Sequence, residues 1–97
     1  MKKIDLTEYQ AEEKPYNVKN TMVALLFNPG LKLSARDLIA QDALAKKIEQ
    51  SDGSIILEDA EYQKVKKSVE VITGWQRGDL EFVNRVLEAN DVEVKEA

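Results

Sequence analysis

The chain contains no cysteine and no histidine. The missing cysteines exclude disulfides and thiolate metal sites, and the missing histidines remove the commonest general base at neutral pH and the commonest metal ligand. A serine nucleophile would need a base beside it, yet no Ser-x-x-Lys or Gly-x-Ser-x-Gly pattern is present. The sequence therefore predicts no enzymatic activity, no catalytic residue, no metal site and no cofactor.

A strong excess of charge of either sign is also lacking. There are 14 basic and 18 acidic residues, which gives a net charge of −4. Nucleic-acid affinity depends largely on Lys and Arg that neutralise phosphates, so this balance argues against nucleic acid as a partner. The longest apolar run, residues 22–27, is far too short to span a bilayer, and residues 1–5 do not read as a signal peptide. We expect no membrane association and a location in a reducing cytoplasm.

What is present is a 97-residue chain with 43% hydrophobic residues, enough for one domain with one core. We predict a mainly helical α+β fold with about four helices, a short N-terminal strand or hairpin and one short central strand. The helices are expected from Asn17 or Asn20 to about residue 27, over 35–50, over 60–73 and over 80–89. The strands are expected at 2–6, 14–18 and 54–57, and residues 92–94 either add an edge strand or fray.

Residues 1–16 leave two alternatives open. Strands at 2–6 and 14–18 can form a hairpin in which Pro15 permits only an edge position, or the segment can be a mobile arm. For the helices, Ser34, Asp59 and Asp79 are the expected N-caps. Apolar periodicity predicts the buried faces, which are Leu38, Gln41, Leu44, Ala45 and Ile48; then Tyr62, Val65, Val69 and Ile72; then Phe82, Val83, Val86 and Leu87.

Trp75, Gln76 and Arg77 lie between two glycines in the loop that joins the last two helices. Trp and Arg are enriched at binding hot spots, so this loop is a candidate partner-binding surface. The alternative is that Trp75 folds back to close the core while Arg77 is solvated or paired with Asp79.

The first helix is apolar nearly all round, from Met22 to Phe27. A helix of this kind is buried on most sides, so Met22 and Phe27 are either central core residues or part of a contact with another subunit or a protein partner. Homo-oligomerisation stays open. The lysines at 64, 66 and 67 read as the solvated face of a helix, with contact to an acidic partner as the alternative.

Two segments carry a resemblance. Residues 1–7 (MKKIDLT) and residues 54–67 (SIILEDAEYQKVKK) are similar to the opening strand and to the later strand-then-helix segment of small proteins from tailed bacteriophages and prophages. They cover about a fifth of the chain. The resemblance implies a setting in the virion or in the cytoplasm of a bacterial host, and it carries over no functional residue.

The leading hypothesis is therefore a phage-like, non-catalytic protein-binding module for virion assembly or an accessory role. One alternative is a small phage inhibitor of a host defence or transcription protein. Another is a helix-turn-helix regulator, against which the single basic residue of the last helix, Arg85, argues.

Overall fold

Helices dominate the regular structure, as predicted. The computed structural model describes residues 1–92. In that part the helices are α1 (Val18–Leu26), α2 (Ala35–Glu49), α3 (Asp59–Val71) and α4 (Leu80–Leu87), with short 3₁₀ turns η1 (Pro29–Leu31) and η2 (Arg77–Asp79). The strands are β1 (Lys2–Asp5), β2 (Tyr9–Ala11), β3 (Lys14–Tyr16), β4 (Ser54–Leu57) and β5 (Asn90–Asp91). The predicted mainly helical α+β class is confirmed, and no helix of the described residues is long and apolar enough to cross a membrane.

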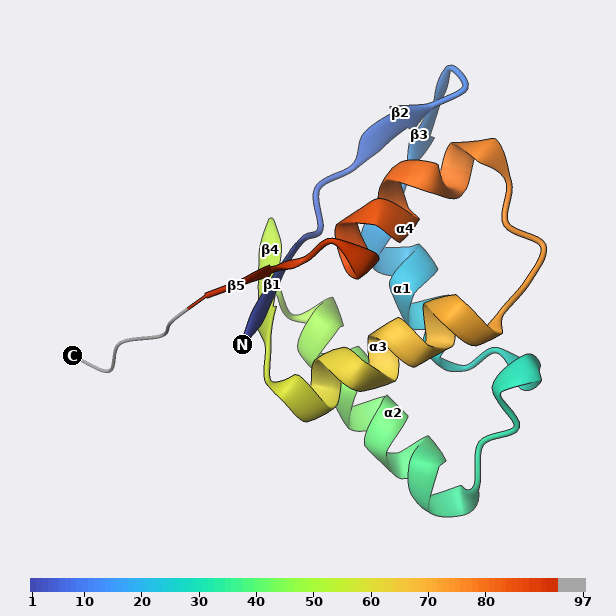
Figure 1. Ribbon diagram of the computed structural model, residues 1–97, viewed down its shortest axis with the longest axis vertical. Helices are drawn as coiled ribbons and strands as arrows, with labels where there is room; N and C mark the ends of the chain where they lie inside the picture. Colours follow the sequence, from blue (N-terminus) through green and yellow to red (C-terminus); the bar gives the residue numbers. More distant parts are fainter. Residues whose placement is uncertain (93–97) are drawn as a thin grey trace.

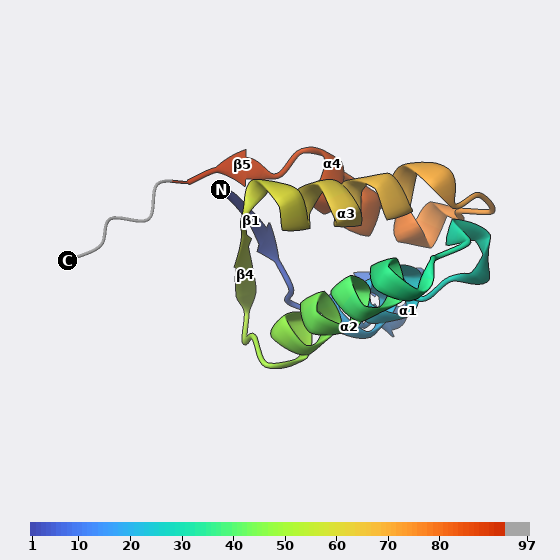
Figure 2. The same ribbon diagram turned by 90° about the horizontal axis from the view of Figure 1, so that it is seen from below.

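The helices form two layers. Viewed from below, α1 and α2 lie on one side and α3 and α4 on the other, and β1 and β4 stand at one end of both layers (Figure 2). The hairpin of β2 and β3 projects beside α4 at the opposite edge from α2 (Figure 1). The core between the layers is mainly aliphatic, with Phe82 and Tyr62 as its buried aromatic residues, and its fully covered side chains include Ile4, Met22, Leu26, Ile48, Leu57 and Phe82.

The first strand has a different partner from the predicted one. Strand β1 is the centre of a three-stranded antiparallel sheet of order β4-β1-β5, in which Ile4 lies opposite Ile55. Both side chains are buried, so pairing with the apolar strand β4 covers the apolar face of β1, which residues 14–18 could not do. The hairpin of residues 2–6 with 14–18, one of the two alternatives for residues 1–16, was therefore wrong.

A hairpin does form in the N-terminal segment, but within residues 9–16. Strands β2 and β3 pair antiparallel, with Tyr9 opposite Tyr16 and Gln10 opposite Pro15. The turn residues Glu12 and Glu13 have positive φ angles of 52° and 69°. This conformation matches a tight primed hairpin turn, and such turns normally use Asn or Gly.

Three helix starts and three of the four N-cap positions were located correctly, although the side chain at one of these positions does not cap its helix. Asn17, rather than Asn20, caps α1, and Ser34 caps α2 by accepting the Asp37 N–H. Helix α3 starts one residue earlier than predicted, because Glu58 is its N-cap and donates its N–H to the carboxylate of Glu61. The Asp79 side chain does not cap α4 but accepts a hydrogen bond from Gln76 N–H, at the start of η2.

The predicted faces are buried along most of each helix but not at the ends. Leu38 is 49% exposed because the first turns of α2 extend beyond the layer that covers Gln41, Leu44 and Ile48. Leu87 is exposed at the end of α4, and Ile72 is half-buried just after α3. The last strand lies at Asn90–Asp91, earlier than the predicted 92–94, of which residues 93 and 94 lie outside the described part.

Candidate functional site

Four of the six aromatic residues form one continuous cluster where the hairpin meets α4. The rings of Tyr9 and Tyr16 are stacked, with centroids 4.6 Å apart. The ring centroid of Phe82 lies 6.1 Å from that of Tyr16 and 6.0 Å from that of Trp75. Such aromatic contacts stabilise a fold by more than the burial of their surface alone would contribute. The cluster therefore fixes a short hairpin, which would be marginal alone, onto the helical body.

The tyrosine hydroxyls attach the hairpin to the start of α4. Tyr9 Oη donates to the Gly78 carbonyl at 2.8 Å and accepts the Phe82 N–H at 3.2 Å. Tyr16 Oη donates to the Asp79 carboxylate at 2.6 Å. Burial, followed by the hydrogen bond to Asp79, raises the pKa of Tyr16 far above its usual value, and burial also raises the pKa of Tyr9. Both hydroxyls are therefore protonated donors at neutral pH.

Arg85 secures the other end of the hairpin connection. Its guanidinium lies 5.1 Å from the Tyr9 ring centroid, donates to the Thr7 carbonyl at 2.6 Å and pairs with Glu81 at 2.6 Å. A cation at this distance over an aromatic face is favourable. Arg85 is thus engaged on all sides by its own chain.

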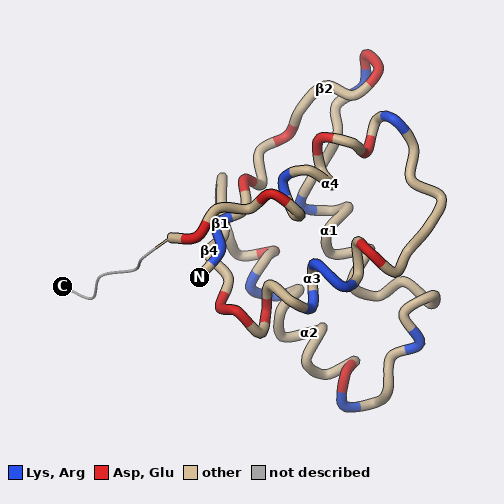
Figure 3. The backbone as a smooth tube through the Cα atoms, in the orientation of Figure 1, with Lys and Arg blue, Asp and Glu red and all other residues tan. Residues whose placement is uncertain are grey.

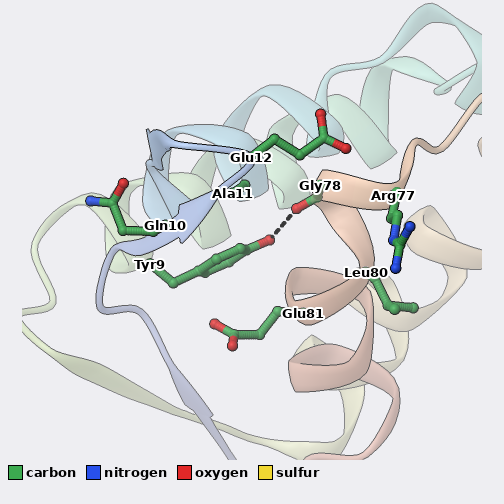
Figure 4. A pocket seen from close by; sticks show the side chains of 8 residues that line it. All are labelled: Tyr9, Gln10, Ala11, Glu12, Arg77, Gly78, Leu80 and Glu81. Carbon is green, nitrogen blue, oxygen red and sulfur yellow. Dashed lines mark hydrogen bonds between the residues drawn. The ribbon is translucent and has the colours of Figure 1, made fainter.

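A groove of about 390 Å³ lies between the clamped hairpin and the start of α4. Its hairpin wall is formed by Tyr9, Gln10, Ala11 and Glu12, and its other wall by Arg77, Gly78, Leu80 and Glu81 (Figure 4). Leu80 is 58% exposed. The groove therefore presents an apolar side chain and an aromatic ring next to charges of both signs.

The structure separates the three predicted loop residues. Trp75 is half-buried against Phe82, and its indole N–H donates to the carbonyls of Ile72 at 3.0 Å and Val69 at 3.2 Å, which closes the end of α3. Gln76 and Arg77 are exposed, and Arg77 has no ion-pair partner in the described residues. Trp75 thus takes the core-closing alternative, while Arg77 lines the groove.

The two candidate binding residues of the first helix, Met22 and Phe27, also differ in how far they are buried. Met22 is completely buried, which is the central-core alternative, and Phe27 is 36% exposed at the C-cap. Neither lines the groove. Any contact through Met22 would require α1 to leave the core.

Most residues of the groove were not singled out from the sequence. Tyr9 and Glu12 lie about 70 positions before Leu80 and Glu81 along the chain, and the aromatic cluster and the tyrosine hydrogen bonds bring the two segments together. Apolar periodicity carried no signal for Leu80, because its spacing of three from Val83 and seven from Leu87 places it on the predicted buried face.

The described residues contain no group of three or more acidic side chains placed to hold a metal ion. No protein-family model, curated protein or solved structure matched this chain. The resemblance to phage proteins therefore stays a prediction.

Proposed function

We propose that this protein is a non-catalytic protein-binding module and that the groove between the hairpin and α4 holds a segment of its partner. The observation that carries this proposal is the 58% exposure of Leu80 beside the exposed Arg77, in a groove whose far wall is a tyrosine. Tyr and Arg are among the residues that dominate binding energies. A partner segment would remove this apolar surface from water, which is favourable.

The charges of the groove specify the partner segment. Glu12 and Glu81 contribute two negative charges and Arg77 one positive charge, so the lining has a net charge of −1. An extended segment with an apolar side chain for Leu80 and a Lys or Arg for Glu12 complements this surface, because Glu81 is already paired with Arg85.

The contacts of Tyr9 and Tyr16 with the start of α4 hold the groove in a fixed shape. Hydrogen bonds from both tyrosines and the stacked rings hold the hairpin wall in place before a partner arrives. A preorganised surface binds more tightly because less conformational entropy is lost on association.

A pull-down from bacterial lysate and from phage-infected cells, read by mass spectrometry, tests the proposal with three versions of the protein. The double variant Leu80→Ser/Arg77→Ala is expected to lose a partner that the unchanged protein captures. The matched control Ile39→Ser/Arg36→Ala removes an exposed apolar residue and an exposed arginine from α2 and is expected to keep it. Equal capture by all three proteins, each shown to be folded by circular dichroism, would contradict the groove as the binding site.

The same experiment distinguishes the settings proposed for this module. Recovery of phage structural proteins, or of the bait alone with self-association in solution, favours a role in virion assembly. Recovery of one host protein in stoichiometric amount favours a small inhibitor that acts in the host cytoplasm. The helix-turn-helix alternative has less support, since Arg85, the single basic residue of α4, is held by Thr7 and Glu81 and is not free to contact DNA.

A further inference from the structure

A second pocket, of about 190 Å³, lies where the connection between α1 and α2 meets the start of α2 and the middle of α3. None of its lining residues belongs to the groove between the hairpin and α4. Leu31 and Leu33 form an apolar part of its wall, and both are half-buried. The pocket therefore offers a short aliphatic group some cover from water.

Both buried polar side chains of the described chain line this pocket. They are Gln41, 4% exposed, and Ser68, 2% exposed. The amide nitrogen of Gln41 donates to the Leu26 carbonyl at 3.2 Å, which uses one of its two N–H groups. Buried polar groups are normally retained only where they have partners. The second N–H of Gln41 has no acceptor in the described residues.

The charged residues of the pocket carry a net charge of +1. Lys64 and Lys67 lie one turn apart on α3 and form no ion pair with any described residue, and Asp37 across the pocket is likewise unpaired. Figure 3 shows a run of basic residues along α3. Two lysines and one aspartate complement a single negative charge better than the double charge of a phosphate.

We propose that this pocket binds a carboxylate group that carries a short aliphatic chain. The carboxylate pairs with Lys64 and Lys67 and accepts the free N–H of Gln41, and the aliphatic chain contacts Leu31 and Leu33. Binding in the millimolar range is expected for a ligand of about six heavy atoms. The site is independent of the partner-binding groove, so either proposal can fail alone.

Butyrate is the first probe, titrated at constant ionic strength into ¹⁵N-labelled full-length protein. The expected result is a saturable change in the Gln41 side-chain amide and in the backbone amides around Asp37 and Lys64. Butyramide has the same shape without the charge and is expected to cause no saturable change. Equal shifts with butyramide, or no saturable shift with butyrate up to about 50 mM, would overturn the proposal.

Charge variants test the assigned residues. Lys64→Gln/Lys67→Gln is expected to weaken butyrate binding about tenfold, and Asp37→Asn is expected to strengthen it about two- to threefold because a like charge is removed. Lys66→Gln is the matched control, since Lys66 is on the same helix but does not line the pocket. Weakening by Lys66→Gln equal to that by the double variant would assign the binding to general charge and overturn the site.

A last comparison distinguishes two sources of the same carboxylate. N-acetyl-alanylvaline has its carboxylate at a peptide C-terminus, and its amidated form lacks the charge. Tighter binding of the free peptide than of butyrate would assign the pocket to a polypeptide C-terminus, and weaker binding would assign it to a free small acid.

Discussion

The Tyr16 hydroxyl donates a 2.6 Å hydrogen bond to the carboxylate of Asp79, which lies 63 positions further along the chain. The same carboxylate accepts the Gln76 N–H at 2.9 Å. One acidic side chain therefore orders the turn before α4 and holds the hairpin against it. This relationship makes the hairpin part of the folded body.

Replacement of Tyr16 by phenylalanine is expected to lower the free energy of unfolding by about 1–2 kcal/mol. It keeps the ring stacked on Tyr9 but removes a hydrogen bond to a charged acceptor. Urea titration followed by circular dichroism measures the change. Gln10→Ala, at an exposed position of the same hairpin, is the control and should leave the midpoint unchanged; an unchanged midpoint for Tyr16→Phe would contradict the clamp.

High pH is expected to weaken the same contact. The pKa of Tyr16 is raised in the folded protein above its usual value of about 10, so the unfolded chain loses the hydroxyl proton first. The stabilisation is complete below about pH 10 and is lost progressively as the pH rises toward the folded pKa. Unfolding midpoints at pH 8 and pH 10.5 should therefore differ more for the unchanged protein than for Tyr16→Phe. The same slope in both proteins would contradict this assignment.

The hairpin turn is expected to be a source of strain. Glu12 and Glu13 both have positive φ, which costs a residue other than glycine roughly 1–2 kcal/mol. Glu12→Asn/Glu13→Gly should therefore raise the free energy of unfolding by about 1 kcal/mol. Glu12→Gln/Glu13→Gln removes the same charges without relieving the backbone, so it should have little effect. If the two double variants change stability equally, charge rather than strain is responsible.

Acid is expected to weaken the contact between α2 and α3. Burial of Glu61 alone would raise the pKa of its carboxyl group. The 2.7 Å contact with Lys47 and the hydrogen bond from the Glu58 N–H have a larger opposite effect, so the pKa is lowered. This contribution is present above the unfolded pKa of about 4.5 and is lost as the pH falls through the folded pKa.

The free energy of unfolding of Glu61→Gln should therefore fall less steeply between about pH 5 and pH 3 than that of the unchanged protein. At neutral pH the variant should be less stable by under about 1 kcal/mol, because the Lys47–Glu61 pair is partly exposed. Some acid dependence should remain, since hydrogen bonds from the Thr7 hydroxyl and N–H lower the pKa of Asp5. Glu49→Gln, an exposed acid on α2 without an ion pair in the described residues, is the control and should keep the full slope.

The two ends of α2 are expected to respond differently to substitution. Ile39 is 72% exposed and Ile48 is completely buried. Ile39→Lys should change the free energy of unfolding by less than about 0.5 kcal/mol, whereas Ile48→Ala should lower it by about 2–5 kcal/mol. Thermal or urea unfolding measures both. A large loss for Ile39→Lys would show that the start of α2 is covered in solution, for example by a second copy of the chain.

Local sequence signals predicted the four helices and strand β4 well. Asn17 and Ser34 cap helices because their short side chains accept hydrogen bonds from backbone N–H groups within three positions. The spacing of Tyr62, Val65 and Val69 predicted the buried face of α3 for the same reason, since one helical turn relates them. Such interactions depend on neighbours in the chain, so the sequence contains them directly.

Partners that are distant in the sequence were not predictable in this way. The pairing of β1 with β4 joins two strand faces whose buried residues Ile4 and Ile55 lie about 50 positions apart along the chain. The side on which Trp75 is buried depends on Phe82, and the position of Arg77 depends on a hairpin about 65 residues earlier. The loop was a correct place to look for an exposed residue, but Trp75 and Arg77 could not be separated without their neighbours.

The class of fold, the places where helices begin and the lack of the side chains that most enzymes and metal sites use can all be read from the amino-acid sequence. These features follow from composition and from interactions within a few residues. Which apolar residues are covered, which strands pair, and that Tyr9, Arg77 and Leu80 share one groove are known only from the packed fold. The physical reason is that burial and pairing between distant segments depend on packing geometry, which no local pattern specifies.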